Sequence, residues 1–356
     1  MPPKMTTHQR MTRMLNHQEA DRVPITDSLW GATLERWHNE GLPKDINWTE
    51  HFGFDQFSHI GVDNSPRFPH KVFESTDEYD LVFSAWGATQ KNFKHRGGVP
   101  EFLDFTIKDR PSWEIVKARM TPTRDRVNWD QLKRDYPKWK AQGAWIEAGF
   151  WFGFDVTHSW AVGTTRVLEA MIDDPDWLVE MFNHWLDVDI ALFEMVWQEG
   201  YHFDAIGWPD DLGYKGHQFF SPTMYRDLLK PVHKRAADWA RAKGCKVRLH
   251  SCGDVRPFID DFLEIGVDIL NPIEVKAGMD PLALKAKDGD RLTFHGGLNA
   301  ALFWEPEKML AHMRQVIPAM KQNGGYILSS DHSIPDSVSL AQFTEWVRVA
   351  NELAAY

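Results

Sequence analysis

The sequence predicts an α/β fold, a single (β/α)8 TIM barrel, and three observations support this. Eight short apolar runs end in polar or Gly residues, and helical patterns lie between them. Strands that alternate with helices pair in parallel through right-handed crossovers. The patterns Gly-x-Gly-x-x-Gly and Gly-x-x-x-x-Gly-Lys-Ser/Thr do not occur, which disfavours an open doubly wound sheet, the alternative. Because the chain has no internal repeat and no Gly/Ser linker, residues 1–356 are predicted to form one domain.

The predicted elements follow in order along the chain. Strands are expected at residues 23–26, 56–60, 145–150, 203–208, 246–249, 267–270, 292–294 and 326–329. The clearest helices are expected at 175–199, from 221 to a stop at Gly244, at 257–265 and at 306–322, where apolar residues recur at helical spacing. Proline at the start of a helix and glycine past its end is the usual asymmetry of helix termini.

Residues 69–126 fit this alternation poorly. The segments 79–85 and 101–108 look like strands of an insertion between the second and third β/α units. We expect this insertion to cover one mouth of the barrel as a lid or wall.

Composition excludes several kinds of partner and compartment. Lys plus Arg total 40 and Asp plus Glu total 51, a formal net charge of −11, so no nucleic acid and no anionic membrane surface is expected as a partner. The first residues lack the apolar core of a signal peptide and no apolar run spans a bilayer, so we expect a soluble, cytoplasmic protein. Two cysteines do not build a disulfide framework. The 17 tryptophans suit a cavity for a flat or apolar ligand.

Polar, titratable residues stand at the end of every predicted strand. They are Asp27, His59, Asp63, Glu147, Asp210, Asp211, His250, Cys252, Asn271, Glu274, His295, Asn299, Asp331 and His332. Catalytic groups of a barrel gather at the C-terminal ends of its strands, so we expect these side chains to surround one pocket. Taken singly, each residue is better explained by a chain that turns polar where a strand ends.

The sharpest of these ends is His250-Ser251-Cys252-Gly253-Asp254. Residues i and i+2 of a strand point to the same side, so the imidazole of His250 and the thiol of Cys252 are predicted to face one point. Imidazole and thiolate together suit Zn²⁺, and His332 is the predicted third ligand. The alternative is a buried thiol beside a hydrogen-bonded histidine. Cys245 lies at the opposite end of the same strand, where we expect a structural role.

Three carboxylates are predicted to assist this site. Asp210 and Asp211 are adjacent, so only one of them can face the mouth, as a general base or substrate anchor, while the other caps a turn. Asp210, Glu147 and Asp331 are also candidates for a fourth ligand or for a partner that orients an imidazole. We therefore predict catalytic roles for Asp210, Glu147 and Asp331.

Several ordered motifs resemble those of a known family. They are Leu249-His250-Ser251-Cys252-Gly253-Asp254-Val255-Arg256-Pro257, Gly266-Val267-Asp268-Ile269-Leu270-Asn271-Pro272, Ala277-Gly278-Met279-Asp280-Pro281, Gly296-Gly297 and Gly325-Tyr326-Ile327-Leu328-Ser329-Ser330. This pattern closely resembles the uroporphyrinogen decarboxylase superfamily, from about Phe203 to the C-terminus and more weakly from Arg22 onward. The resemblance implies a (β/α)8 barrel with its pocket at the C-terminal mouth.

Within that superfamily the chain looks like the branch of cobalamin-dependent methyltransferases, which carries His-x-Cys at the fifth strand. Decarboxylases resemble one another in an Arg-Gln-Ala-Gly-Arg stretch whose arginines hold the carboxylates of the substrate. Residues 27–37 stand there instead, and only Arg36 offers a matching charge. The methyltransferases often carry a further Cys where this chain has His332, and decarboxylases also have His there, so this residue does not separate the branches.

The resemblance implies a zinc-dependent enzyme that moves a methyl group between a small methylated compound, such as a methoxylated aromatic, and the cobalt of cobalamin. The chain has no Asp-x-His-x-x-Gly corrinoid signature, so the cobalamin is expected on a separate corrinoid protein. Metal-independent decarboxylation is the second hypothesis, and a non-catalytic small-molecule binder is the third. The cations available for decarboxylation are Arg67, Arg96, Arg166 and Arg256. The residues predicted to contact substrate are Asp27, Trp30, Arg36, Trp208, Asn271 and His295.

Overall fold

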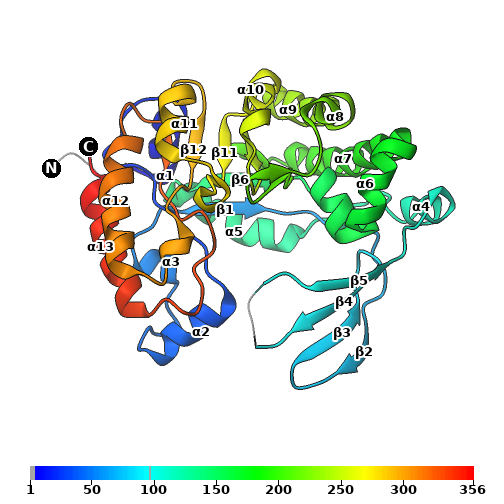
Figure 1. The fold of residues 1–356 in the computed structure, drawn as a ribbon, viewed down its shortest axis with the longest axis horizontal. Helices are drawn as coiled ribbons and strands as arrows, with labels where there is room; N and C mark the ends of the chain where they lie inside the picture. The colour runs from blue at the N-terminus through cyan, green and yellow to red at the C-terminus, as the bar shows by residue number, and fades with distance from the viewer. Residues whose placement is uncertain (1–4, 96–97) are drawn as a thin grey trace.

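A parallel sheet that follows the order of the chain is the centre of the computed structural model, which describes residues 5–95 and 98–356 (Figure 1). Its strands are β1 (Phe57–Ile60), β6 (Trp145–Gly149), β7 (Ala205–Pro209), β10 (Lys246–His250), β11 (Ile269–Asn271), β12 (Thr293–His295) and β13 (Tyr326–Ile327), paired in that order. Every pairing is parallel. These strands correspond to all but the first of the predicted ones, and their ends lie within two residues of the prediction.

The first predicted strand, at residues 23–26, is an extended segment that links the two edges of the sheet. Ile25 forms an isolated parallel bridge with Leu328, the residue after β13. On its other side, the backbone N–H of Asp55, just before β1, donates to the Ile25 carbonyl at 2.9 Å. The sheet therefore curls until its first and last strands are connected through this segment, as in a TIM-like barrel.

Helices cover the outside of this sheet (Figure 1). The α-helices are α1 (Thr7–Leu15), α2 (Gly31–Asn39), α3 (Trp48–His51), α4 (Arg110–Lys117), α5 (Trp129–Gln142), α6 (Thr164–Asp173), α7 (Pro175–Gln198), α8 (Pro222–Met224), α9 (Lys230–Ala242), α10 (Ile259–Ile265), α11 (Pro281–Asp288), α12 (Pro306–Met320) and α13 (Leu340–Ala354). Short 3-10 turns lie at Arg124–Arg126, Arg256–Phe258, Val275–Ala277 and Ala300–Leu302, and π-helical segments at Val156–Val162 and Tyr225–Leu229. Within the described ranges, no helix combines the length and the apolar character that crossing a membrane requires.

The helix predicted between residue 221 and Gly244 is divided. The short α8 runs into the π-helical segment Tyr225–Leu229, and α9 begins at Lys230 with Pro231 in its first turn. Proline has no N–H to continue the hydrogen-bond ladder of the preceding turn, so the regular α-helix restarts there. The other three predicted helices correspond to α7, α10 and α12.

Between β1 and β6 the chain forms a separate four-stranded antiparallel sheet, at the position of the predicted insertion (Figure 1). Its strands are β2 (Lys71–Ser75), β3 (Tyr79–Phe83), β4 (Ala88–Phe93) and β5 (Glu101–Phe105), in that order. The sequence predicted β3 and β5 but missed the other two. Strand β2 is exposed along its whole length and β4 is mostly polar, so neither shows an apolar run. A small ribbon of β8 (Gly213–Tyr214) and β9 (His217–Gln218) follows β7.

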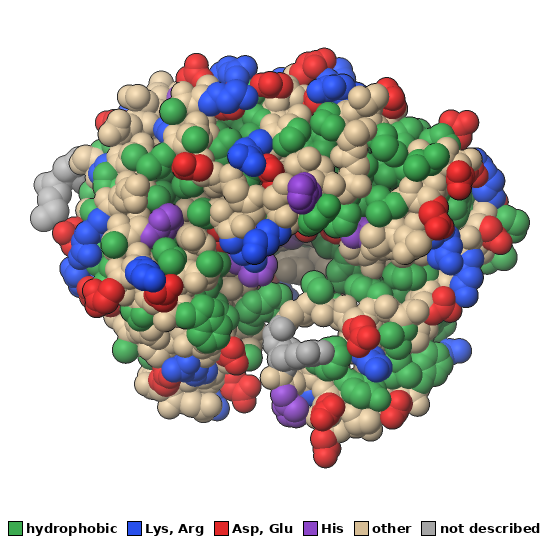
Figure 2. Space-filling view, viewed as in Figure 1, with side chains coloured by type: hydrophobic (Ala, Val, Ile, Leu, Met, Phe, Trp, Pro, Cys, Tyr) green, Lys and Arg blue, Asp and Glu red, His purple; other side chains and the backbone are tan. Residues whose placement is uncertain are grey.

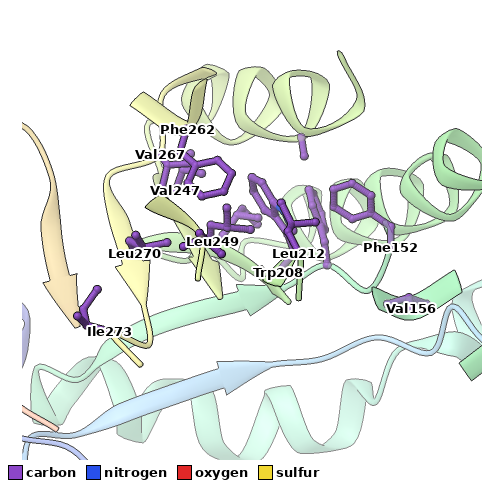
Figure 3. Packing of buried hydrophobic residues seen from close by; sticks show 14 of the residues in the cluster. Phe152, Val156, Trp208, Leu212, Val247, Leu249, Phe262, Val267, Leu270 and Ile273 are labelled. Atoms are coloured by element: carbon purple, nitrogen blue, oxygen red, sulfur yellow. The ribbon is translucent and has the colours of Figure 1, made fainter. Parts of the chain in front are cut away.

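Two apolar clusters lie on the two sides of the parallel sheet. The larger cluster packs the strands against the outer helices, and Val247 and Leu249 of β10 belong to it (Figure 3). The smaller cluster joins Met11 and Leu15 of α1 to residues of four strands inside the barrel, namely Trp145, Ala205, Ile269 and Ile327. Since three of these are the first residues of their strands, the cluster closes the N-terminal end of the barrel. The opposite end, where the strands finish, is the end at which barrels carry their sites.

Candidate active site

Three metal-binding groups converge where β7 and β10 end. The Nε2 atom of His250 lies 3.5 Å from the Sγ atom of Cys252 and 3.7 Å from the Oδ1 atom of Asp211. The three donor atoms all lie within 4.8 Å of one another. Donor atoms bound to one tetrahedral zinc ion are about 3.5 Å apart, so this trio matches the spacing of three ligands of a single ion.

Asn271 sets the orientation of the His250 ring. The Nδ1 atom of His250 lies 2.7 Å from Oδ1 of Asn271, and Nδ2 of Asn271 donates to the His295 carbonyl at 3.4 Å. An amide whose nitrogen is used in this way presents its oxygen to the ring, so Nδ1 carries the proton. The Nε2 atom that faces Cys252 is then free to act as a ligand. Asn271, which the sequence predicted to contact substrate, therefore positions His250.

The backbone after β10 is fixed so that Cys252 returns to the same point as His250. Cys252 donates its N–H to Oδ1 of Asp211 at 2.7 Å, and Gly253 donates to Oε2 of Glu274 at 2.6 Å. Gly253 has a φ of 84°, and a Cβ atom there would lie 2.1 Å from the carbonyl carbon of Gly213, so the turn requires glycine. The His-x-Cys spacing thus brings the imidazole and the thiol together, as the i, i+2 pattern predicted.

Negative charge surrounds the Cys252 thiol. Burial raises the pKa of this thiol, and the carboxylates of Asp211 and Glu274 raise it further. Burial also raises the pKa of Asp155 to about 7, with Asp211 and Asp210 adding to the effect. A bound cation stabilises carboxylates that repel one another in this way, and it favours the thiolate form of a cysteine.

His332, the predicted third ligand, is not part of this trio. Its side chain is exposed, and Asp211 supplies the third donor atom instead. Partial burial, followed by the charge of Lys276, lowers the pKa of His332, and His250 also contributes, so the residue does lie at this mouth. The neighbouring Asp331 is buried, whereas His332 is exposed in the bend that follows the last strand.

Asp210 is not at the mouth either. Its side chain is completely buried, and its carboxylate accepts the N–H of Asp155 at 2.7 Å and lies 2.7 Å from Nε2 of His233. Asp211, and not Asp210, is the carboxylate that reaches the trio, and the catalytic role of Asp210 stays a prediction. The sequence showed that only one of two adjacent carboxylates can face the mouth, but it did not show which one.

The two other predicted catalytic carboxylates are engaged by the protein itself. Glu147 lies inside the barrel, with Oε2 at 2.9 Å from Nε of Arg248. Asp331 accepts the N–H groups of Val275 and Ala300 at 2.8 Å each, and so ties two loops to the end of the last strand. Burial raises the pKa of Asp331 to about 6. Asp331 therefore supports the rim of the site from beneath.

Two cavities adjoin the trio. The first, of about 700 Å³, is lined by strand ends and by Trp86 of the insertion. The second, of about 890 Å³, is lined by residues of β5 and of the π-helical segment after β6. His250 and Trp160 line both cavities. Figure 2 shows a hollow between the barrel and the insertion, so the insertion forms one wall of the site, while its movement as a lid stays a prediction.

Two residues predicted to contact substrate lie near the first cavity. Trp208 lines it, and its ring packs against Phe152 and His233. His295 lies inside the barrel, where burial lowers its pKa to about 3 and the charge of Arg248 lowers it further. His295 therefore lies within the curled sheet, whereas the Trp208 ring lies on the helix side of β7, in the larger cluster with its β10 neighbour Leu249.

Three more residues predicted to contact substrate line neither cavity. Asp27 accepts the hydroxyl of Ser330 at 2.7 Å. Trp30 is the residue before α2, and Arg36 on that helix pairs with Glu40 at 2.6 Å. The stretch at residues 27–37 therefore belongs to a different part of the rim.

The sequence interpretation missed Arg248 and Asp155. Arg248 lines the first cavity and precedes His250 by two residues, so the rule that placed Cys252 could have placed it as well. Asp155 lines the second cavity directly before the π-helical segment Val156–Val162. No motif marks this residue in the sequence, because its place depends on how the chain turns after β6.

The chain is similar to known proteins in sequence and in fold. The family model described as uroporphyrinogen decarboxylase (URO-D) matches residues 156–353. No curated protein matches the chain significantly. Among solved structures, a methyltransferase from Methanosarcina mazei is 16% identical with a TM-score of 0.65, and the match covers 99% of this chain and 100% of that chain. A B12-independent methionine synthase from Shewanella sp. W3-18-1 in complex with selenomethionine is 11% identical with a TM-score of 0.45, over 96% of this chain and 97% of that chain.

Proposed function

The chain belongs to the uroporphyrinogen decarboxylase family, and from this premise we propose that it is a zinc-dependent methyltransferase. It would move a methyl group between a small methylated compound and the cobalt of a separate corrinoid protein. The observation that carries the proposal is the trio of His250, Cys252 and Asp211 at the edge of a cavity with aromatic walls. The fold shared with a methyltransferase supports it.

The donor set favours Zn²⁺ over other common cations. It combines one imidazole nitrogen, one sulfur and one carboxylate oxygen, whereas Mg²⁺ and Ca²⁺ prefer oxygen alone. Three protein ligands with a further position for water or substrate are typical of catalytic zinc sites. When bound, Zn²⁺ supplies a Lewis acid that polarises a substrate oxygen or activates a thiolate.

The residues around the trio support such a reaction. Trp151 and Trp160 meet edge to face, with ring centroids 5.7 Å apart, and offer flat apolar surface to the ring of a methoxylated aromatic. Asp155 holds a proton near neutral pH and accepts the hydroxyl of Ser159 at 3.0 Å. It lines the second cavity together with Asp211, so it can supply a proton on the side of the trio that faces this cavity.

The corrinoid is proposed on a separate protein because the chain itself carries no Asp-x-His-x-x-Gly signature. The second cavity opens toward β5 of the insertion and is lined by both His250 and Asp211. A corrinoid protein would present its cofactor at this second cavity, and the small compound would occupy the first cavity.

Metal analysis combined with an activity assay tests the proposal. We expect one zinc per chain, and methyl transfer from a methoxylated aromatic to cob(I)alamin, followed by the change in cobalamin absorbance. Transfer should vanish after chelation and return when Zn²⁺ is added. Zinc-loaded protein that transfers no methyl group from any donor, with corrinoid protein supplied, contradicts the proposal. Transfer that persists in a variant lacking both His250 and Cys252 contradicts the assigned site.

Metal-independent decarboxylation remains the second candidate because the family takes its name from that activity. It requires several arginines around the mouth to hold the carboxylates of a tetrapyrrole. Arg67 is paired with Asp63 and Asp125, and Arg256 with Asp254, so neither is available. Arg96 lies outside the described residues.

Two arginines, Arg248 and Arg166, line the cavities in the described part of the chain. Arg166 already donates to the Val162 carbonyl at 2.7 Å. This leaves one guanidinium for a substrate that carries many carboxylates. Release of carbon dioxide from uroporphyrinogen that is insensitive to chelation would establish the decarboxylase over the methyltransferase.

A further inference from the structure

Arg248 is an inward-facing cation on the wall of the first cavity. Strand β10 alternates in burial, with Val247 and Leu249 packed against the helices and Arg248 and His250 on the side of the barrel interior. The side chain of Arg248 is 24% exposed, and its Nε atom lies 2.9 Å from Oε2 of Glu147. A charged group is placed in such an interior only where a partner offsets its loss of water.

The terminal nitrogens of this guanidinium have no partner. Among the residues that the structure describes, no acceptor forms a hydrogen bond with Nη1 or Nη2 of Arg248. The buried Arg126 differs, because its three nitrogens donate to four backbone carbonyls. A guanidinium presents its donors as a planar fork that matches the two oxygens of a carboxylate. Glu147 therefore pairs with Arg248 by charge at Nε, without a hydrogen bond, and the terminal nitrogens stay open.

Arg248 lies against a glycine of the neighbouring strand. Gly149, Gly207 and Arg248 lie side by side on β6, β7 and β10. A Cβ atom on Gly207 would lie 3.1 Å from Nε and 3.2 Å from Nη2 of Arg248, which is tighter than ordinary contact. Both glycines line the first cavity together with Arg248. The missing side chain at Gly207 thus gives the guanidinium of Arg248 room to lie against β7 on the wall of the cavity.

The rest of the cavity selects a flat apolar body. Its lining includes Trp86, Trp151 and Trp160, and His250 of the trio lines it as well. One acidic residue of the lining, Asp63, is already paired with Arg67 at 2.5 Å. The cavity combines aromatic walls, one guanidinium with open donors and access to the trio. These features suit an aromatic ring that carries a carboxylate.

We infer that Arg248 binds the carboxylate of an aromatic acid, so that the methyl donor is a methoxybenzoate-type compound rather than a neutral aromatic ether. This inference rests on the proposed function for the reaction that follows, but the binding step itself needs neither zinc nor corrinoid. Arg248 is accordingly a specificity-determining residue. Glu147 holds it in position and does not touch the ligand.

The binding of matched acids and amides tests this inference. The probes are the three methoxybenzoate isomers and the corresponding methoxybenzamides, which have the same shape but no charge. Titration of the zinc-free protein, followed by tryptophan fluorescence and calorimetry, should show at least one isomer bound tenfold or more tighter as the acid. Arg248→Gln should abolish this preference, and Arg248→Lys should keep only part of it. Arg166→Gln is the matched control and should keep all of it.

Equal binding of acid and amide by the wild-type protein, or an unchanged preference in Arg248→Gln, would overturn the inference. If Arg248→Gln does not fold because Glu147 loses its partner, the double variant Glu147→Gln/Arg248→Gln replaces it, and it should bind acid and amide equally. Acid-selective binding without methyl transfer contradicts the proposed function but supports the inference about Arg248. Methyl transfer from neutral and acidic ethers at the same kcat/KM overturns the inference and leaves the proposed function standing.

Discussion

The two ends of strand β10 each carry a cysteine, Cys245 buried and Cys252 partly buried, and the two sites have opposite surroundings. At the start of the strand, Cys245 donates through Sγ to the Phe203 carbonyl at 3.2 Å, and burial raises its pKa to about 12. At the other end, Cys252 has His250 and two carboxylates around it. Burial is therefore common to both thiols, and the neighbouring groups decide which thiol can bind a metal.

The largest effect is expected at Cys252, where substitution removes the sulfur ligand. Cys252→Ser should lose nearly all bound zinc and all zinc-dependent methyl transfer, because a neutral hydroxyl is a poor ligand for Zn²⁺. Cys245→Ser is the matched control at the other end of the strand. It should keep its zinc and lose about 1 kcal/mol of stability. Metal analysis and urea unfolding of both variants measure the difference in zinc content and in stability. Equal zinc loss in the two variants would contradict the different roles of the two cysteines.

Substitution in the apolar cluster at the start of the strands should lower stability without changing the zinc content. Ile269→Ala deletes buried methyl groups beside Ala205 and Ile327, so it should lower the free energy of unfolding by about 2–5 kcal/mol. Its zinc content should not change. The control is Ile115→Ala on α4, where the side chain is 66% exposed, and it should cost little. Zinc loss in Ile269→Ala at a temperature where the protein stays folded would show that the two ends are not independent.

A pH-dependent effect is expected from Asp331 beneath the rim. Burial raises its pKa to about 6 from 3.8, so the folded state disfavours the charged form. Its contribution to stability is present below about pH 4 and is lost as the pH rises through 6. Asp331→Asn lacks this loss, so its stability relative to wild type should improve by about 2 kcal/mol between pH 4 and pH 7.

Urea unfolding of both metal-free proteins across this pH range measures the effect of Asp331. The variant also loses one acceptor for the N–H groups of Val275 and Ala300, so it should start below wild type at low pH. A difference between the two proteins that does not change with pH would mean that Asp331 is not the titrating group.

Asn271 allows a smaller and more specific test of the metal end. Asn271→Ala removes the acceptor that holds His250, and loss of such a partner weakens metal binding by about 10–100-fold. Asn271→Asp keeps an acceptor at the same place and should restore most of the affinity. Competition with a zinc chelator measures both variants. Unchanged affinity in Asn271→Ala would mean that the ring of His250 is held by other contacts.

The smallest effect is expected at His332. Since its exposed ring lies outside the trio, His332→Ala should change zinc affinity by less than about threefold, whereas Asp211→Asn should weaken it far more. The same chelator competition compares the two. A larger loss in His332→Ala than in Asp211→Asn would return the third ligand to His332, as the sequence suggested.

Most of the parallel sheet was predictable from the sequence because each of its strands is a short apolar run between turn signals. Strand β10 illustrates this, with its end located to within one residue. The strands β2 and β4 of the insertion were not predictable. Their side chains are exposed or polar and show no apolar run, so backbone pairing with the neighbouring strands β3 and β5 holds them in place.

The candidate site was predictable only where local geometry decides the outcome. The spacing of His250 and Cys252 fixes their common direction, and the structure brings them together. The choice between Asp210 and Asp211 depends on the loop after β6, which contributes the N–H of Asp155 to Asp210. The outward turn of His332 depends likewise on backbone groups of two other loops that bind Asp331. Such contacts between loops leave no periodic signal in a single sequence.

Gly149 and Gly207 decide which changes of sequence the first cavity can tolerate. Neither glycine has a positive φ, so each position accepts a side chain as far as the backbone is concerned. A single methyl group at Gly149 would press on the His59 ring, and one at Gly207 would press on Arg248. Each glycine therefore makes room for a different lining residue of the first cavity, and a larger residue at either position would displace that side chain.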